Sequence, residues 1–139
     1  MKFEHLANLF MNWGWIVEPA DYEGFKNYLS TMLKRRHVVV IWNGPLIEAV
    51  MTYIITDDYH KFLGKPIWST PEDEPYGLQV YIDKIVCRRF TRELWRKIRD
   101  FMEDNFQGQE EAVYHRPFDN RTIIIKRRNK NVNLSVAEV

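Results

Sequence analysis

A strand pattern that slips by one residue and then leads into a helix constrains the fold more than any other feature of this chain. Val80 and Ile82 alternate with polar or aromatic neighbours, which is the period of a strand with one buried face. The next apolar positions of the strand, Ile85 and Cys87, have the opposite parity. One extra residue in a strand produces this slip, so we predict a β-bulge at Asp83-Lys84. Bulges of this kind are common beside functional sites.

Apolar residues at helical spacing predict three helices. The predicted helices cover residues 3–10, 19–36 and 92–106. Pro19 suits the first turn of the second helix, and the basic run 34–36 suits its C-terminus. Thr91 is a good cap for the third helix because its hydroxyl can accept a bond from a free backbone N–H group.

Alternating and β-branched residues predict the strands. The predicted strands cover residues 13–17, 38–42, 46–56, 77–87, 111–115 and 122–126. Asn43-Gly44 between two of these runs is the strongest short signal for a hairpin. Residues 57–76 contain Gly64, three prolines and an acidic run, which predicts a long loop of the kind that is often functional.

This order of elements predicts an α+β domain with a mixed, mainly antiparallel sheet, a bulged central strand and helices on its faces. The third helix would cross over and place strand 111–115 parallel to the bulged strand. A chain of 139 residues is long enough to bury one core. We therefore expect a single domain over residues 1–128 and a flexible polar tail over residues 129–139.

Composition narrows the classes of function. A single cysteine and four scattered histidines predict no metal site, and no apolar run approaches the roughly 20 residues that cross a bilayer. Residues 1–83 carry a net charge of −4 and residues 84–139 carry +5. The basic half suits phosphate or an acidic protein face, but few aromatic residues lie among its arginines, so nucleic acid is not favoured. The N-terminus lacks the layout of a signal peptide, which makes a cytoplasmic location the default expectation.

The element order, the hairpin and the slipped parity at Asp83-Lys84 together resemble the GCN5-related N-acetyltransferase (GNAT) fold over residues 15–128. In that family the bulged fourth strand diverges from the fifth, and acetyl-CoA lies between them. The bulged backbone holds the thioester carbonyl, and the next helix presents its N-terminus to the pyrophosphate. The resemblance implies a thioester site at the backbone of Lys84, Ile85 and Val86, and phosphate contacts from Arg88, Arg89 and Arg92.

The sequence departs from the family at two places. The family signature has Arg or Gln, two residues, Gly, one residue, then Gly or Ala, and the matching positions here hold Thr91, Leu94 and Arg96. Side chains at the glycine positions obstruct the close approach of backbone to phosphate. The family also places a helix between its fifth and sixth strands, and residues 116–121 are too few to form one.

Three residues are candidates for acid–base chemistry. Glu48 and Asp83 are alternative general bases that would take a proton from an amine, and Tyr114 would donate one to a leaving thiolate. Each also has a structural interpretation: Glu48 as a solvent-facing strand residue, Asp83 as part of the bulge, and Tyr114 as one member of an in–out alternation. Cys87 has no partner histidine at a readable spacing, so we interpret it as a core thiol.

Aromatic residues on the hairpin and its loop are candidates for a protein interface. Trp42, Trp68 and Tyr76 are the three positions, and Trp68, among the loop prolines, is the one that we most expect to be exposed. Two hypotheses follow. The first is a divergent, non-catalytic GNAT-like protein that binds no cofactor and acts through a protein partner or self-assembly; it resembles small GNAT-like proteins of tailed phages, some of them virion components. The second is an N-acetyltransferase that uses acetyl-CoA on a primary amine.

Overall fold

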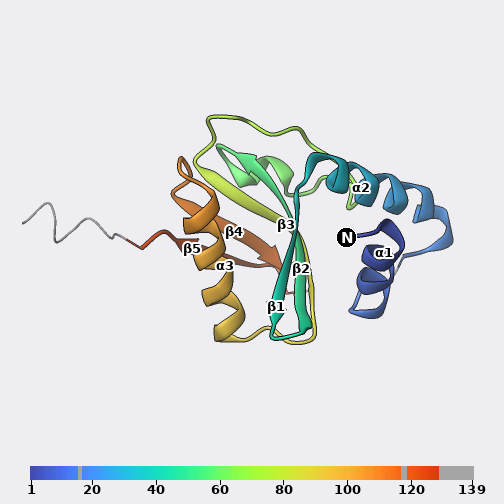
Figure 1. The fold of residues 1–139 in the computed structure, drawn as a ribbon. Helices are drawn as coiled ribbons and strands as arrows, with labels where there is room; N and C mark the ends of the chain where they lie inside the picture. Colours follow the sequence, from blue (N-terminus) through green and yellow to red (C-terminus); the bar gives the residue numbers. More distant parts are fainter. Residues whose placement is uncertain (16, 117–118, 129–139) are drawn as a thin grey trace, which may run out of the picture.

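A five-stranded sheet with the order β1-β2-β3-β4-β5 organises the molecule (Figure 1). The structure is a computed structural model that describes residues 1–15, 17–116 and 119–128. The strands are β1 (Val38–Asn43), β2 (Leu46–Thr56), β3 (Gln79–Cys87), β4 (Glu111–Arg116) and β5 (Arg121–Lys126). The helices are α1 (Phe3–Asn12), α2 (Tyr22–Arg35) and α3 (Arg92–Asn105), with short 3-10 turns η1 (Pro19–Asp21) and η2 (Tyr59–Phe62). The predicted α+β class is confirmed, and the predicted tail lies outside the described residues.

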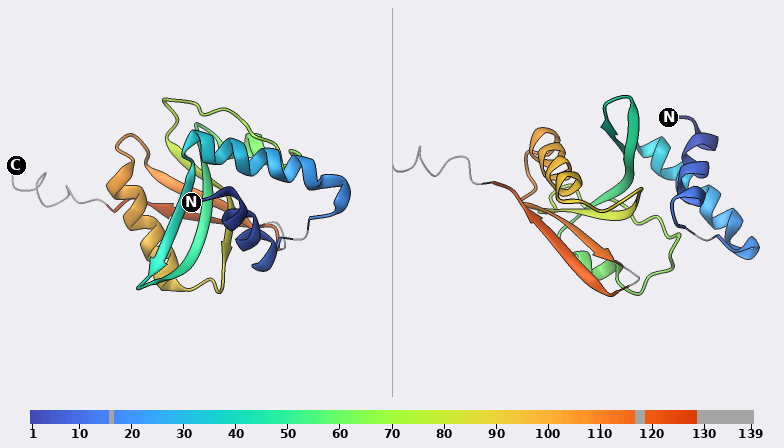
Figure 2. Two further views of the ribbon diagram at one scale, coloured as in Figure 1. Left: turned by 45° about the vertical axis from the view of Figure 1, so that its right-hand side comes forward. Right: turned by 90° about the horizontal axis from the view of Figure 1, so that it is seen from below.

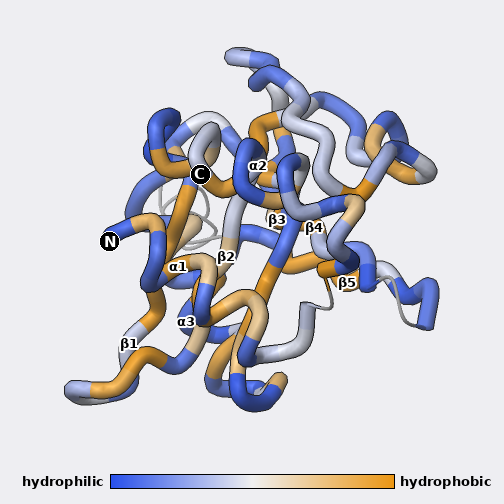
Figure 3. Tube along the Cα trace, turned by 90° about the vertical axis from the view of Figure 1, so that its right-hand side faces the viewer, coloured by the Kyte–Doolittle hydropathy of each residue, from blue (hydrophilic) through white to orange (hydrophobic). Residues whose placement is uncertain are grey.

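Neighbouring strands pair antiparallel except β3 and β4, which pair in parallel through the α3 crossover, as predicted. Helices α1 and α2 cover one face of the sheet and α3 covers the other (Figure 2). Hydrophobic residues concentrate along the central strands, whereas the peripheral loops are mostly hydrophilic (Figure 3). The fold therefore has two apolar layers, one on each side of the sheet.

The predicted bulge is present in β3. Tyr53 of β2 pairs with Ile82 and Thr52 pairs with Lys84, so Asp83 is the extra residue. Val80, Ile82, Ile85 and Cys87 all pack in the layer under α3, which explains the parity slip in the sequence. The bulge also turns Asp83 and Lys84 toward the same face, the one covered by α1 and α2.

The hairpin is where the sequence predicts it, but its two connecting residues are Gly44 and Pro45, because Asn43 already pairs with Leu46. Gly44 has a φ of +61°, a conformation that glycine adopts without the strain that a side chain would cause.

The predicted strand at residues 13–17 is wrong for the described residues of that segment, which contain no strand. The Trp13 N–H donates to the Leu9 carbonyl and the Trp15 N–H donates to the Phe10 carbonyl, so the segment prolongs the end of α1. An apolar extended-looking run forms a strand only beside a partner strand. Here the indole of Trp15 instead packs on the sheet beside Trp68.

The acidic run in the 57–76 loop fixes that loop to the sheet and to α2. The Arg35 guanidinium donates to Glu72 at 2.8 Å. The Asp73 carboxylate accepts the backbone N–H of Ile55 at 2.9 Å and lies 3.0 Å from Nε2 of His37. These bonds fix the loop against α2 and β2, a position that the sequence alone does not predict.

A substitution at Gly77, which directly follows this loop, tests how tightly the loop packs against the end of β2. A Cβ atom at Gly77 would overlap the backbone carbonyl group of Thr56 and stand 2.9 Å from the Asp57 nitrogen. Backbone cannot move aside cheaply, so we expect Gly77→Ala to lower the free energy of unfolding by about 1–3 kcal/mol. Gly108→Ala is the matched control, because nothing lies within 4 Å of its added methyl group. Urea denaturation of both variants measures the difference, and equal stabilities would contradict the packing described.

Candidate functional site

The candidate site lies where β3 separates from β4. The two strands pair from Gln79 with Glu111 to Ile82 with Tyr114, and β3 then continues to Cys87 without β4. Separation begins at the bulge residue. The bulge is therefore also the place where the sheet opens.

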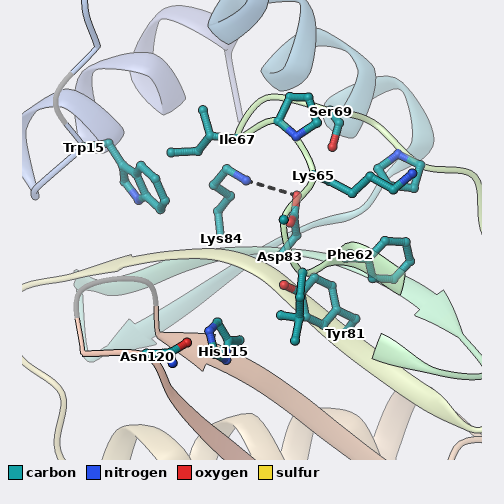
Figure 4. Close-up of a pocket in the computed structure, with 14 residues that line it drawn as sticks. Trp15, Phe62, Lys65, Ile67, Ser69, Tyr81, Asp83, Lys84, His115 and Asn120 are labelled. Carbon is teal, nitrogen blue, oxygen red and sulfur yellow. Dashed lines mark hydrogen bonds and ion pairs between the residues drawn. The ribbon is translucent and has the colours of Figure 1, made fainter. Parts of the chain in front are cut away.

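A buried ion pair occupies this position. Lys84 is only 4% exposed, and its Nζ lies 3.4 Å from Oδ2 of Asp83 (Figure 4). Three aromatic rings surround the ammonium group, with centroid distances of 5.5 Å to Trp15, 4.7 Å to Tyr28 and 5.4 Å to Trp68. Aromatic faces attract a cation, so the rings and the carboxylate together offset the cost of burying the charge.

A chain of hydroxyl groups holds the carboxylate. The Tyr28 hydroxyl donates to Oδ2 of Asp83 at 2.5 Å and lies 2.6 Å from Oγ1 of Thr52. Because the single Tyr28 proton goes to Asp83, the Thr52 hydroxyl is the donor in the second bond. Oγ1 of Thr52 in turn accepts the backbone N–H of Lys84 at 3.1 Å. The network closes on itself and fixes the bulge to α2.

Burial sets the protonation behaviour of the network. Loss of solvent lowers the pKa of Lys84, and the neighbouring Asp83 charge opposes that change. Burial, and next the Asp83 charge, raise the pKa of Tyr28 well above its ordinary value. Tyr28 therefore remains a neutral donor to the carboxylate at all physiological pH values.

A pocket of about 370 Å³ opens beside the ion pair (Figure 4). Its walls come from the loop that holds Ile67, from Trp15, from His115 near the end of β4, and from Asn120 immediately before β5. Asp83 and Lys84 line it with Tyr81. The lining is mostly apolar with a few convergent polar groups, which is the usual composition of a site for a small ligand.

The two predicted bases lie on opposite faces of the sheet. Glu48 forms a 2.6 Å ion pair with Lys97 of α3, whereas Asp83 faces α2. Glu48 is itself the extra residue of a second bulge, because Ile41 pairs with Ala49 and Trp42 pairs with Ile47. It lines a separate pocket of about 350 Å³.

Tyr114 lies in the layer under α3 and is 4% exposed. Its ring stacks with that of Phe90 at a centroid distance of 6.2 Å and packs at a tilt against that of Trp95 at 6.1 Å. The Phe90 and Trp95 rings stack at 5.5 Å. Burial raises the pKa of the Tyr114 hydroxyl well above its ordinary value. The structure does not bring Tyr114 to Asp83, and the stack covers the last β3–β4 pair.

The predicted cofactor residues divide between core and surface. The Ile85 and Val86 side chains are buried in opposite layers, and their backbones pair with β2. Arg88, Arg89 and Arg92 are exposed. The Arg88 guanidinium lies 5.9 Å from the Trp13 ring.

The N-terminus of α3 is partly satisfied by the chain itself. Oγ1 of Thr91 accepts the backbone N–H of Leu94 at 3.1 Å, as the capping prediction requires. Leu94, at a position where the GNAT signature has glycine, is fully buried in the layer under α3.

The predicted interface residues do not form one surface. Trp42 is 54% exposed and Tyr76 is 95% exposed. The two lie near opposite ends of β2, because Trp42 pairs with Ile47, whereas Tyr76 is next to Gly77, which lies against Thr56. The prediction that Trp68 is exposed is wrong. Its indole packs 5.0 Å from Phe25 and covers Lys84, because the acidic run holds its loop against α2.

Sequence reasoning missed Tyr28, Thr52 and Trp15 as parts of the site. Tyr28 had a readable signal, since it lies three residues after Phe25 and four before Met32 on the buried stripe of α2. A bulge that turns a lysine and an aspartate to the same covered face requires polar partners there. The Trp15 contact has no local signal.

Comparisons of this chain with protein-family models, with curated proteins and with solved structures found no match. Among the described residues, no group of three or more His, Cys, Asp or Glu side chains is placed to hold a metal ion. In the same part of the chain, no helix is long and apolar enough to span a membrane.

The ion pair gives a stability prediction. Asp83→Ala would leave the Lys84 charge buried without its carboxylate, and we expect a loss of about 3–5 kcal/mol in the free energy of unfolding. The double variant Asp83→Ala with Lys84→Met should recover much of that loss. Arg96→Ala, which breaks an exposed pair with Glu93, should cost less than about 1 kcal/mol. A double-mutant cycle compares Asp83→Ala, Lys84→Met and their combination. If the costs of the two single changes simply add in the double variant, the pairing is contradicted.

Tyr81 gives a pH prediction. Burial, and next the Asp83 charge, raise its pKa from 10.0 to about 12. Between these values the unfolded chain has lost the proton and the folded chain keeps it, so stability falls as pH rises through this window. Tyr81→Phe should make that fall shallower by up to about 1.4 kcal/mol per pH unit. Urea unfolding from pH 9 to pH 12 measures the slope, Tyr76→Phe is the exposed control, and an unchanged slope for Tyr81→Phe would refute the assignment.

Proposed function

We propose that this chain is a divergent GNAT-like domain that works without acetyl-CoA, as a protein-binding or structural component. One observation carries the proposal. The rings of Phe90, Trp95 and Tyr114 stack over the last β3–β4 pair, beside the region in which the resemblance places the arm of the cofactor. A ligand there would have to displace packed aromatic side chains.

The phosphate end of the implied cofactor site gives further support. Thr91 already caps α3, and the fully buried Leu94 replaces a glycine of the family signature. The nearby pocket that Arg88 lines also contains the carboxylates of Glu48 and Glu93. Arg89 lines this pocket too, so its two carboxylates balance its two guanidinium groups and leave no net positive charge to attract a diphosphate.

The residues that would bind an amine substrate also favour a non-catalytic role. The candidate base Asp83 already binds a primary amine, the ammonium group of Lys84, and accepts the Tyr28 hydroxyl as well. An amine substrate would compete with an amine of the chain itself, which is held in an aromatic cage. This arrangement favours a stabilising role for the carboxylate.

The outer end of the β1–β2 hairpin supports binding to protein. Trp42 and Leu46 are each 54% exposed, and Leu46 lines the same pocket as the exposed Arg88 and Arg89. Tryptophan and arginine are enriched among the residues that dominate binding energy at protein interfaces. On the resemblance to small GNAT-like phage proteins, we extend the proposal to a component of a tailed-phage particle.

An acetyl-CoA-dependent N-acetyltransferase is the second candidate. The pocket at the separation of β3 and β4 favours it, because Asp83 lines that pocket. In this reaction Asp83 would take a proton from the amine, and the amine nitrogen would attack the thioester carbonyl and release the thiol of coenzyme A.

Calorimetry with acetyl-CoA separates the two candidates. We expect no binding heat up to millimolar cofactor, because the stack obstructs the cofactor and the balanced charges of the neighbouring pocket do not attract its diphosphate. Micromolar binding that Arg88→Ala weakens, while the exposed control Arg121→Ala does not, would overturn the proposal. If the stack is the cause of exclusion, Phe90→Ala should bind more cofactor than the wild-type chain.

A further inference from the structure

Strand β1 forms an unprotected edge of the sheet. Charged residues and prolines on an edge strand usually keep it from pairing with another chain. Residues 38–43 contain neither. Within the described ranges, no backbone–backbone hydrogen bond joins the outer side of β1 to another segment. The β1–β2 hairpin stands at the end of the sheet between the two helical layers (Figure 2).

The orientation of the free backbone groups follows from one hydrogen bond. The Tyr53 N–H donates to the His37 carbonyl at 3.2 Å, so residue 37 faces β2. Backbone groups alternate sides along an antiparallel strand. Val38, Val40 and Trp42 therefore direct their N–H and C=O groups away from the sheet.

We propose that two copies of this chain pair through β1, antiparallel and about a two-fold axis at Val40, to form one continuous sheet. In this register Val40 faces Val40 of the second copy, and Val38 faces Trp42 of the second copy. All the outward backbone groups then meet partners, giving up to about six hydrogen bonds. Lys97 already donates to the Trp42 carbonyl at 3.1 Å, and a carbonyl oxygen has a second lone pair for the new bond.

Side chains favour the same register. Val38, Val40 and Trp42 alternate with Val39 and Ile41, so the first three share one face of the sheet. Directly opposite residues of an antiparallel pair lie side by side on one face. The Trp42 indole, 54% exposed in one copy, would then cover the half-buried Val38 of the second copy. An axis at Val39 would place Trp42 opposite residue 36, and an axis at Ile41 would place Val38 opposite Gly44, both outside β1.

Charge does not oppose this association, since the whole chain has a net charge of only +1. The inference rests on the proposed protein-binding function and names its partner as a second copy. It does not depend on the GNAT resemblance. Failure of the pairing would leave the calorimetric test of the cofactor unaffected, so the two can fail separately.

Light scattering over a range of concentrations tests the pairing. The wild-type chain should show twice the monomer mass of 16.8 kDa. Val40→Pro should be monomeric, because proline removes an outward N–H and leaves the β1–β2 ladder intact. Trp42→Lys should be monomeric too, whereas Ile124→Lys, on the opposite edge strand and 48% exposed, should remain a dimer.

Amide exchange supplies a second measurement that does not need the proline variant to fold. In the wild-type dimer the Val40 amide should exchange slowly, and in Trp42→Lys it should exchange at least tenfold faster. A wild-type chain that is monomeric at every concentration would overturn the inference. So would a dimer that persists in Trp42→Lys, or a Val40 amide that exchanges fast in the dimer.

Discussion

The buried pair of Asp83 and Lys84 is the interaction on which the rest of the structure depends. A strand that alternates regularly would place these neighbours on opposite faces, and the bulge places both under α2. A charge in that position must be compensated, because burying an isolated ammonium group is very costly. The carboxylate and three aromatic rings supply the compensation, and those rings come from segments far apart in the chain.

This requirement explains features that are otherwise unrelated. The loop that carries Trp68 is fixed by the acidic run, so its indole reaches the lysine. Tyr28 uses its hydroxyl on Asp83 and its ring on Lys84. Residues 13–15 continue from the end of α1 and do not join the sheet. Trp15 thereby becomes one of the three rings around the Lys84 ammonium group. One slip of register in β3 thus determines how two helices and a long loop pack.

The sequence predicted what depends on short-range patterns and missed what depends on long-range partners. The bulge was readable because apolar parity reports which face of a strand is buried, and the α3 cap was readable from Thr91. The strand predicted at residues 13–17 failed because a strand exists only beside a partner. Trp68 was misplaced because its burial depends on Arg35 and Glu72, which are 37 residues apart.

The candidate site shows the same division. Asp83 was predicted at the bulge, where the structure has it, but nothing local in the sequence shows that it faces α2 while Glu48 faces α3. The face of a strand residue is set by every bulge that precedes it along the ladder, and this sheet has two. Candidate groups on neighbouring strands, such as Glu48 and Asp83, can therefore be separated by the sheet itself.

Side chains of the chain itself occupy the bulge and the separation of β3 from β4, whereas the outer edge of β1 has no partner strand. Lys84 occupies the carboxylate that an amine would need, and Phe90 packs over Tyr114 where the sheet separates. The outward groups of β1 have no backbone partner in the described part of the chain, and β1 itself carries no charged residue, although Lys97 of α3 donates to the Trp42 carbonyl. Unpaired backbone on a β-branched edge is a strong template for another strand. Recognition through the edge of the sheet therefore needs no rearrangement of the core, whereas recognition at the bulge would have to break the ion pair that holds the fold together.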